Sequence, residues 1–172
     1  MAAAVAEVGA KGWGGATIDG IATRAGVGRA SIYRRWGSKY ELFQYAAESI
    51  TQSSAGVDTG SFVDDLFAAL LPIANMLTQP DLAALLPSLL AEATNDEAVR
   101  STVRTFAGRC RQQAVDAVER ARDRGDVPPS TDADALVDML AGGLVYRRLL
   151  LGEAADAAAI RALIRQALGE WT

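Results

Sequence analysis

Three arginines, a tyrosine and a serine fall within the seven residues from Arg29 to Arg35. A guanidinium presents planar N–H donors that match a phosphate group or the O6 and N7 atoms of guanine. A tyrosine or serine beside it can contact a thymine methyl group or a phosphate oxygen. Such a segment suits the major groove of DNA better than a protein core, so we predict a DNA-binding helix over about residues 29–36.

The flanking residues predict a helix-turn-helix followed by a capped third helix. The hydroxyl of Thr17 can cap the first helix by accepting a free backbone N–H. Gly26 supplies the turn, because a residue without a Cβ adopts positive φ at little cost. Val27 and Ile32 are expected to fill the angle between the two helices. The sequence Ser38-x-x-Glu41 is typical of a capping box at the start of the next helix.

These residues resemble the DNA-binding domain of the TetR family of bacterial transcriptional regulators. The shared pattern consists of Thr17, Ile21-Ala22, Ala25-Gly26-Val27, Ile32-Tyr33, Trp36, Ser38-Lys39 and Leu42. Direct likeness covers roughly residues 3–50, and only a run of helices is shared beyond it. The resemblance implies an all-α protein of about nine helices, with an N-terminal three-helix helix-turn-helix DNA-binding domain at 1–52 and a helical ligand-binding and dimerisation domain at 53–172.

Within this N-terminal domain (residues 1–52, the head) we predict contacts with double-stranded DNA. Arg29 at the start of the second helix can bind guanine through two parallel hydrogen bonds, with a solvated surface arginine as the alternative. Tyr33 can contact a thymine methyl or a phosphate, or else pack within the head. We expect Arg34, Arg35 and Lys39 to contact phosphates, and Trp36 to belong to the head core. The predicted DNA-binding residues are Thr17, Gly28, Arg29, Ala30, Ser31, Tyr33, Arg34, Arg35 and Lys39.

The charge is distributed unevenly along the chain. The whole sequence has a net charge of −4, but residues 1–40 carry six basic and two acidic side chains, a net charge of +4. The remainder is correspondingly acidic, so attraction to phosphates is confined to one end. Binding there is expected to weaken steeply with salt, because each neutralised phosphate releases a counterion.

Composition excludes several other classes of protein. Half of the residues are hydrophobic and only five are proline, which favours helices. With no histidine and Cys110 as the single cysteine, the chain has neither an internal disulfide nor a zinc site of histidine and cysteine ligands. We expect no cofactor and no metal. The chain has no leader-like start and no run of about 18–20 apolar residues, so we predict a cytoplasmic protein without a membrane segment.

The segment before Thr17 departs from the family pattern. We predict a first helix of about two turns over Ala2–Gly9, followed by a loop that contains Trp13; a helix this short needs tertiary packing. The resembled family carries a longer first helix and often a basic arm before it. Two alternatives follow: the natural chain begins upstream of Met1, or the DNA affinity is reduced.

In the body, residues 53–61 have the composition of a linker, and helical patterns continue to the end. We predict helices over 62–77, interrupted by Pro72, and over 82–93, which contains Pro87. A long helix begins at Asn95 or Asp96 and ends at Gly125. Two more begin near Thr131 and at Asp156.

The resemblance implies a small-molecule pocket and a homodimer. For each pocket residue the plainer alternative is hydrophobic core, and their apolar character points to an apolar or aromatic effector. The predicted ligand-binding residues are Phe67, Leu70, Met76, Leu85, Leu89, Phe106, Cys110, Leu140, Leu144 and Tyr146. The predicted dimer-interface residues, on the last two helices, are Leu136, Met139, Leu151, Ile160, Leu163, Ile164, Ala167, Leu168 and Trp171.

The function that follows is a ligand-responsive regulator, a repressor released from a palindromic operator by its effector. The main alternative is a helical dimerisation or ligand-binding protein with weakened or lost DNA binding, favoured by the short first helix. A transcriptional activator is a further, less favoured alternative. An enzyme is disfavoured, because no histidine is present and Gly12-Trp13-Gly14-Gly15 does not fit a nucleotide-binding loop.

Overall fold

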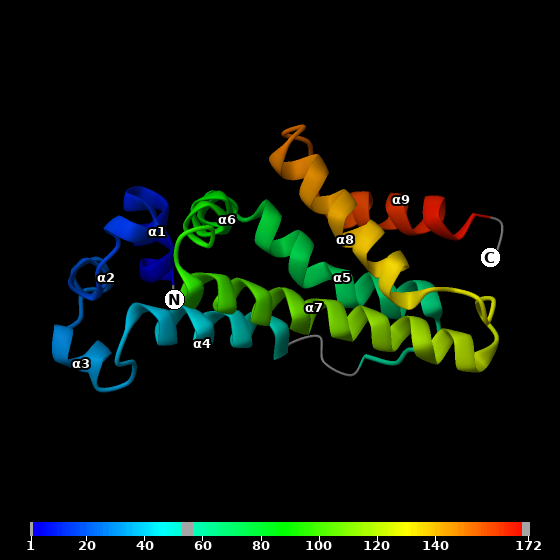
Figure 1. Ribbon diagram of the computed structural model, residues 1–172, viewed down its shortest axis with the longest axis horizontal. Helices are drawn as coiled ribbons and strands as arrows, with labels where there is room; N and C mark the ends of the chain where they lie inside the picture. The colour runs from blue at the N-terminus through cyan, green and yellow to red at the C-terminus, as the bar shows by residue number, and fades with distance from the viewer. Residues whose placement is uncertain (1, 53–56, 170–172) are drawn as a thin grey trace. The chain divides into compact units, whose positions relative to one another are not determined.

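The computed structural model describes the backbone of residues 2–52 and 57–169, and the side chains of residues 2–45, 57–79, 83 and 86–169. Over these residues every regular element is an α-helix, which confirms the predicted all-α class with nine helices (Figure 1). The helices are α1 (Ala2–Gly15), α2 (Ile18–Ala25), α3 (Arg29–Tyr33), α4 (Lys39–Gln52), α5 (Phe62–Thr78), α6 (Pro80–Glu92), α7 (Glu97–Arg124), α8 (Ala133–Leu149) and α9 (Ala157–Leu168).

The helices form two compact units that do not follow chain order. Unit 1 comprises residues 1–50 and 79–107, and unit 2 comprises residues 51–78 and 108–172. Helix α7 therefore contributes residues to both units. The predicted division into a DNA-binding domain at 1–52 and a ligand-binding and dimerisation domain at 53–172 is a division by function, and it stays a proposal.

Unit 1 is built around the buried indole of Trp13. Its ring packs edge-on against Tyr40, with 5.4 Å between ring centroids, and against Phe43, with 4.8 Å. As predicted, Trp36 packs partly buried against the same core. The aliphatic side chains of this core are Ala4, Val5, Val8, Ala16, Ile18, Ile21, Ala22, Ile32, Leu42 and Val99.

Helix α1 differs from the prediction. It continues past Gly9 to Gly15, with a break at Gly12, where φ is 70° and ψ is 169°. Trp13 follows this break and is buried, because the turn at Gly12 directs it into the core instead of a surface loop. The backbone N–H of Trp13 donates to the Ser88 hydroxyl at 2.9 Å, and α1 packs along α6. Long-range packing therefore extends a helix that local sequence signals had ended early.

The helix-turn-helix has the predicted caps. The Thr17 hydroxyl accepts the Gly20 N–H at 3.1 Å, and Gly26 has φ 66° in the turn. The Ser38 hydroxyl accepts the Glu41 N–H at 3.2 Å, while the Glu41 carboxylate reaches back to the Gly37 N–H at 2.9 Å. Val27 and Ile32 were predicted to fill the angle between the two helices. Ile32 is buried there, as predicted, but the prediction is wrong for Val27, which is 47% exposed in the turn.

Unit 2 is mainly aliphatic and is formed by α5, α8 and α9 with the second part of α7. The side chains of its core include Leu66, Leu70, Leu77, Val118, Val137, Leu140, Leu144, Ile160 and Ile164. The Asp156 carboxylate caps α9, as predicted, by accepting the N–H groups of Ala158 and Ala159, each at 3.0 Å. Helix α8 begins after Asp132, which accepts the Ala135 N–H at 3.0 Å, so a carboxylate one residue beyond Thr131 provides the cap.

None of the helices seen over residues 2–52 and 57–169 combines the length and the apolar character that crossing a bilayer requires.

Candidate DNA-binding surface

Helix α3 presents nearly all of its side chains to solvent. Of its five residues only Ile32 is buried, and this side chain fixes which face of the helix meets the core. The other residues of the helix and the two that follow it are exposed, including Arg34 and Arg35. Gly28 precedes the helix in an extended conformation. The structure thus leaves exposed, on and beside α3, these predicted residues: Gly28, Arg29, Ala30, Ser31, Tyr33, Arg34 and Arg35.

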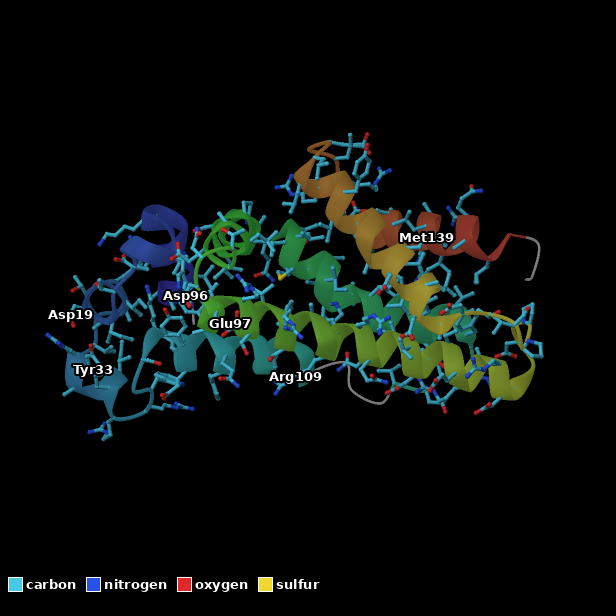
Figure 2. All side chains as sticks on the ribbon, viewed as in Figure 1. Asp19, Tyr33, Asp96, Glu97, Arg109 and Met139 are labelled. Carbon is cyan, nitrogen blue, oxygen red and sulfur yellow. The ribbon has the colours of Figure 1, made fainter. Side chains whose placement is uncertain are left out.

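Arg29 is held between two neighbours. Its Nε lies 2.8 Å from Oδ1 of Asp19, in the first turn of α2, and its guanidinium lies 5.2 Å from the centroid of the Tyr33 ring. Figure 2 labels Asp19 on α2 and Tyr33 on α3. The guanidinium is therefore oriented by a carboxylate and an aromatic face while it remains 64% exposed.

Arg35 is ordered by aromatic side chains. Its Nη2 donates to the Tyr45 hydroxyl at 3.2 Å, and its guanidinium lies 4.9 Å from the Trp36 ring and 5.3 Å from the Tyr45 ring. These contacts hold an exposed positive charge beside α3 without cancelling it, because the partners are uncharged. That arrangement is compatible with the predicted phosphate contact.

Thr17 and Lys39 both have structural partners, and those of Lys39 were not predicted from the sequence. The Thr17 side chain is exposed, with its hydroxyl engaged as the cap of α2. The Lys39 ammonium donates to the carbonyl of Trp13 at 2.8 Å and to that of Ala16 at 3.5 Å, and it lies 5.0 Å from the Trp13 ring. It therefore binds the C-terminal end of α1, and its predicted phosphate contact stays a prediction.

Glu7 joins α1 to α2 of the helix-turn-helix, and the sequence analysis did not identify it. Its carboxylate is buried and lies 2.6 Å from Lys11 Nζ and 3.2 Å from Arg24 Nε. The hydrogen bond from Lys11 outweighs burial, and with Arg24 it holds the pKa of Glu7 below its ordinary value. A Cβ on Gly20 would overlap the Glu7 carboxylate, so a glycine admits this contact between α1 and α2. A glutamate in an apolar helix, four residues before a lysine, was the available signal.

Two family models match the chain. The model described as "Bacterial regulatory proteins, tetR family" matches residues 1–46, and that described as "Tetracyclin repressor-like, C-terminal domain" matches residues 57–167. The chain belongs to the TetR family. It is a DNA-binding transcriptional regulator and not an enzyme.

Curated relatives and solved structures agree with this assignment. The chain is 29% identical over 159 residues to the HTH-type transcriptional regulator YdeS of Bacillus subtilis, covering 91% of this chain and 80% of the relative. It is 29% identical over 158 residues to the DNA-binding transcriptional repressor TetR of Mycobacteroides abscessus, covering 88% and 80%. The crystal structure of the TetR family transcription regulator SCO0332 superposes with a TM-score of 0.70 at 26% identity, over 97% of this chain and 95% of that one. A TetR transcription regulator from Haloarcula marismortui shares the fold, with a TM-score of 0.75 at 20% identity, over 96% and 92%.

The residues predicted to line a ligand pocket are divided between the two units. Leu89 and Phe106 lie in unit 1, where Leu89 packs on the head core, and the side chain of Leu85 lies outside the described residues. Unit 2 holds Phe67, Leu70, Met76, Cys110, Leu140, Leu144 and Tyr146. Of the unit 2 set, four are buried among helices: Leu70, Cys110, Leu140 and Leu144. Tyr146 instead is exposed on α8.

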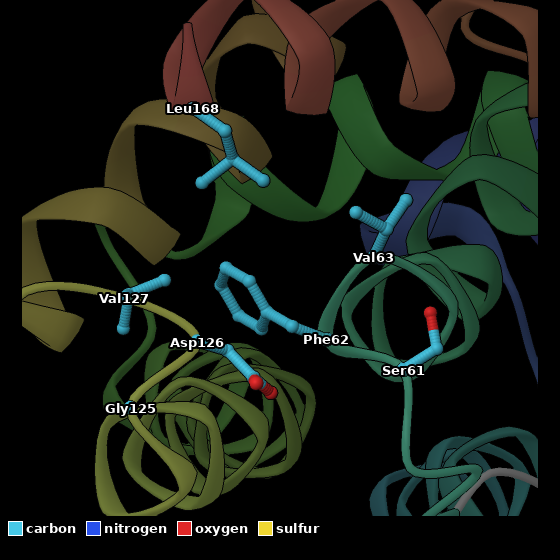
Figure 3. Close-up of a pocket in the computed structure, with 7 residues that line it drawn as sticks. All are labelled: Ser61, Phe62, Val63, Gly125, Asp126, Val127 and Leu168. Atoms are coloured by element: carbon cyan, nitrogen blue, oxygen red, sulfur yellow. The ribbon is translucent and has the colours of Figure 1, made fainter. Parts of the chain in front are cut away.

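A pocket of about 370 Å³ in unit 2 involves none of those residues. It is lined by Ser61, Phe62, Val63, Gly125, Asp126, Val127 and Leu168. Figure 3 shows the apolar side chains of Phe62, Val127 and Leu168 directed toward one another, with Asp126 at the edge. The site combines the start of α5, the loop after α7 and the end of α9, which sequence patterns could not bring together.

The predicted dimer-interface residues also divide into two groups. Leu136, Ile160, Ile164 and Leu168 are buried inside unit 2, which leaves them almost no surface for a second chain. Leu163 and Ala167 are half-buried, and Trp171 lies outside the described residues. The exposed members are Met139 and Leu151. The helical stripe on α9 was correctly recognised as apolar, but it packs against its own chain.

Proposed function

We propose that this chain is a ligand-responsive repressor that binds a palindromic operator as a homodimer and is released by a small apolar or aromatic effector. The observation that supports it most is the exposure of α3: Ile32 alone faces the core, and Arg29, Tyr33 and Arg34 are left for DNA. A cytoplasmic location, where the DNA lies, is part of this proposal.

The side chains exposed on α8 support self-association. Met139, Tyr146 and Leu150 recur at the spacing of one helix face, and Leu151 follows them. Leu150, the C-cap of α8, is 69% exposed, and Figure 2 labels Met139 on α8 itself. Apolar side chains that gather on one surface mark interaction sites, and a two-fold interface pairs one such surface with its own copy. A second copy of this chain is therefore the partner we propose for this face.

A dimer of this kind positions two α3 helices. To read a palindrome they must enter successive major grooves, whose centres lie about 34–36 Å apart on one face of DNA. An effector that binds better to a state with another spacing shifts the population away from the DNA-competent one, by no more than its differential affinity. The apolar set buried in unit 2, which includes Leu70, Leu140 and Leu144, favours an apolar effector.

DNA recognition is tested by selecting duplexes with a randomised core. We expect the wild type to enrich a palindrome and Arg29→Ala to lose preference at one base pair of each half-site. Arg34→Ala should weaken binding to all sequences alike and reduce the salt slope by about 0.9. Arg165→Ala, an exposed arginine on α9, is the matched control and should change neither. Unchanged selection by both head variants would contradict the proposal.

Self-association is tested by sedimentation. Leu150→Glu should convert the dimer to a monomer, whereas Leu90→Glu, at an exposed leucine of α6, should leave it dimeric. A wild-type chain that sediments as a monomer at micromolar concentration would refute the dimer.

The alternative of a dimerisation module without DNA binding has lost its main support. It was favoured by a first helix of about two turns, whereas the helical segment continues beyond the break at Gly12 to Gly15 and its end is held by Lys39. An activator would bind the same duplexes, and in vitro transcription from a promoter carrying the selected palindrome separates it from a repressor by the sign of the change.

A further inference from the structure

Asp19 is the one acidic side chain among the described residues that pairs with an arginine of the 29–35 segment. It lies in the first turn of α2, outside the residues predicted to contact DNA, and its side chain is 55% exposed. A carboxylate beside a DNA-binding helix repels phosphates, so it weakens binding to every sequence. A pair this exposed adds little to folding stability. Its position therefore calls for a role in recognition.

The geometry of the pair suggests what that role is. Asp19 approaches Arg29 at Nε, and the Tyr33 ring lies 5.2 Å from the guanidinium. Because a guanidinium has five N–H donors, a contact at Nε leaves donors on the terminal Nη groups for a planar partner. A long arginine side chain held by two neighbours has lost much of the freedom that would let it reach for a phosphate instead.

We propose that Asp19 is a specificity-determining residue: it holds Arg29 in the orientation that binds a guanine and keeps it away from the DNA backbone. This inference rests on the proposed reading of DNA by α3. Asp19 acts through Arg29 and is a positioning residue that does not itself contact a base. The result is a head that gives up some affinity for all DNA in exchange for discrimination at one base pair in each half-site.

The test uses the full chain and two duplex probes, the palindrome that the wild type selects and a scrambled duplex of the same length. In Asp19→Asn we expect the preference for guanine at the Arg29 position to fall about tenfold. Binding to the scrambled duplex should tighten, and the slope of log affinity against log salt should steepen by about 0.9, because Arg29 is then free to bind one more phosphate.

Glu97→Gln is the matched control, because it also removes one negative charge from an exposed ion pair of unit 1. Glu97 is 71% exposed and lies 2.9 Å from Arg100 at the start of α7 (Figure 2). It should leave both the base preference and the salt slope unchanged. In an Arg29→Ala background, Asp19→Asn should no longer alter base preference, since the residue through which it acts is missing. Equal thermal melting of the single variants and the wild type shows that folding is intact.

The outcomes separate the two claims. If the wild type enriches a palindrome and Asp19→Asn enriches the same guanine equally strongly with an unchanged salt slope, the inference about Asp19 is overturned while the proposed function stands. If Glu97→Gln reproduces the Asp19→Asn effects, net charge explains them and the inference is likewise overturned. If the wild type enriches no sequence, both the proposed function and the inference fall.

Discussion

Each compact unit buries one carboxylate within the part of the chain that the structure describes, and the two are stabilised in different ways. Glu7 in unit 1 lies between two cations, Lys11 and Arg24, which are themselves about half exposed. Asp65 in unit 2 accepts hydrogen bonds from the backbone N–H of Thr59 at 2.7 Å and from its hydroxyl at 2.8 Å, with Arg124 3.6 Å away. Glu7 is stabilised mainly by opposite charges, and Asp65 is stabilised mainly by uncharged hydrogen-bond donors.

The difference matters for function. The Glu7 contacts join α1 to α2 across 17 residues of sequence, so they set the position of the helix-turn-helix on which α3 depends. The hydrogen bonds of Asp65 are local, because Thr59 lies six residues before it, and they hold the segment that enters α5. We infer that the buried carboxylate of unit 1 is held mainly by ion pairs that pH and salt can weaken, whereas that of unit 2 is held mainly by short-range hydrogen bonds.

The largest effect is expected at Asp65. Asp65→Ala should lower the free energy of unfolding by about 3 kcal/mol, because two hydrogen bonds from Thr59 to a charged acceptor and the nearby charge of Arg124 lose their partner. Urea denaturation followed by circular dichroism measures this. Asp64→Ala is the matched control: its side chain is exposed, and we expect a change below about 0.5 kcal/mol. Similar values for the two variants would remove the contrast between the units.

Gly20→Ala tests the fit between α1 and α2. The new methyl group would overlap the pinned Glu7 carboxylate, so we expect a loss of about 2 kcal/mol in the same urea experiment. Gly108→Ala, in α7 with open space around it, should instead stabilise by about 0.5–1 kcal/mol. In the double variant Gly20→Ala/Glu7→Ala most of the clash should disappear; if Gly20→Ala alone is as stable as wild type, Glu7 is not held rigidly.

Glu7→Gln tests the ionic character of the head contact through pH. Because the hydrogen bond from Lys11 lowers the folded-state pKa of Glu7, its ionised form adds stability above the ordinary pKa of 4.5, and this is lost as pH falls. The variant should therefore be less stable than wild type at pH 7, and the gap should close below pH 4.5. Burial raises the pKa of Asp65, but the hydrogen bonds from Thr59, with the charges of Arg120 and Arg124, more than offset this, so the electrostatic part of the difference between Asp65→Ala and wild type should be lost only below pH 3.8. A Glu7 gap independent of pH would contradict the ionic account.

The smallest effect is expected at Cys110, which reports on unit 2. Burial raises the pKa of its thiol to about 11, so little thiolate is present at pH 8 and the sulfur is shielded. A thiol reagent such as iodoacetamide should label native protein far more slowly than urea-unfolded protein. Asp65→Ala should speed labelling and Gly20→Ala should not; the reverse order would contradict independent support of the two units.

Local rules predicted much of this molecule. Thr17, Gly26 and Asp156 were assigned as caps or turns because such positions depend on a few neighbouring residues. The outward face of α3 followed from one buried isoleucine. What could not be predicted are contacts between distant segments, such as Lys39 with the end of α1 and Ser88 with Trp13.

Helical periodicity was informative but incomplete in the body. It identified Ile160, Ile164 and Leu168 as one stripe without showing that this stripe packs on its own chain. The exposed residues on α8, such as Met139, could be identified only once the packing was known. The pocket around Phe62 could not be predicted either, because its wall comes from three segments far apart in sequence.

The central claim is that α3, presented twice by a dimer, reads DNA. Hydroxyl-radical footprinting of the wild-type chain on its selected duplex tests it most directly. We predict two protected stretches on one face of the DNA, with centres about 10 base pairs apart, and their loss in Arg29→Ala at the concentration that protects for wild type. A single protected stretch, or two that persist unchanged in Arg29→Ala, would contradict the account.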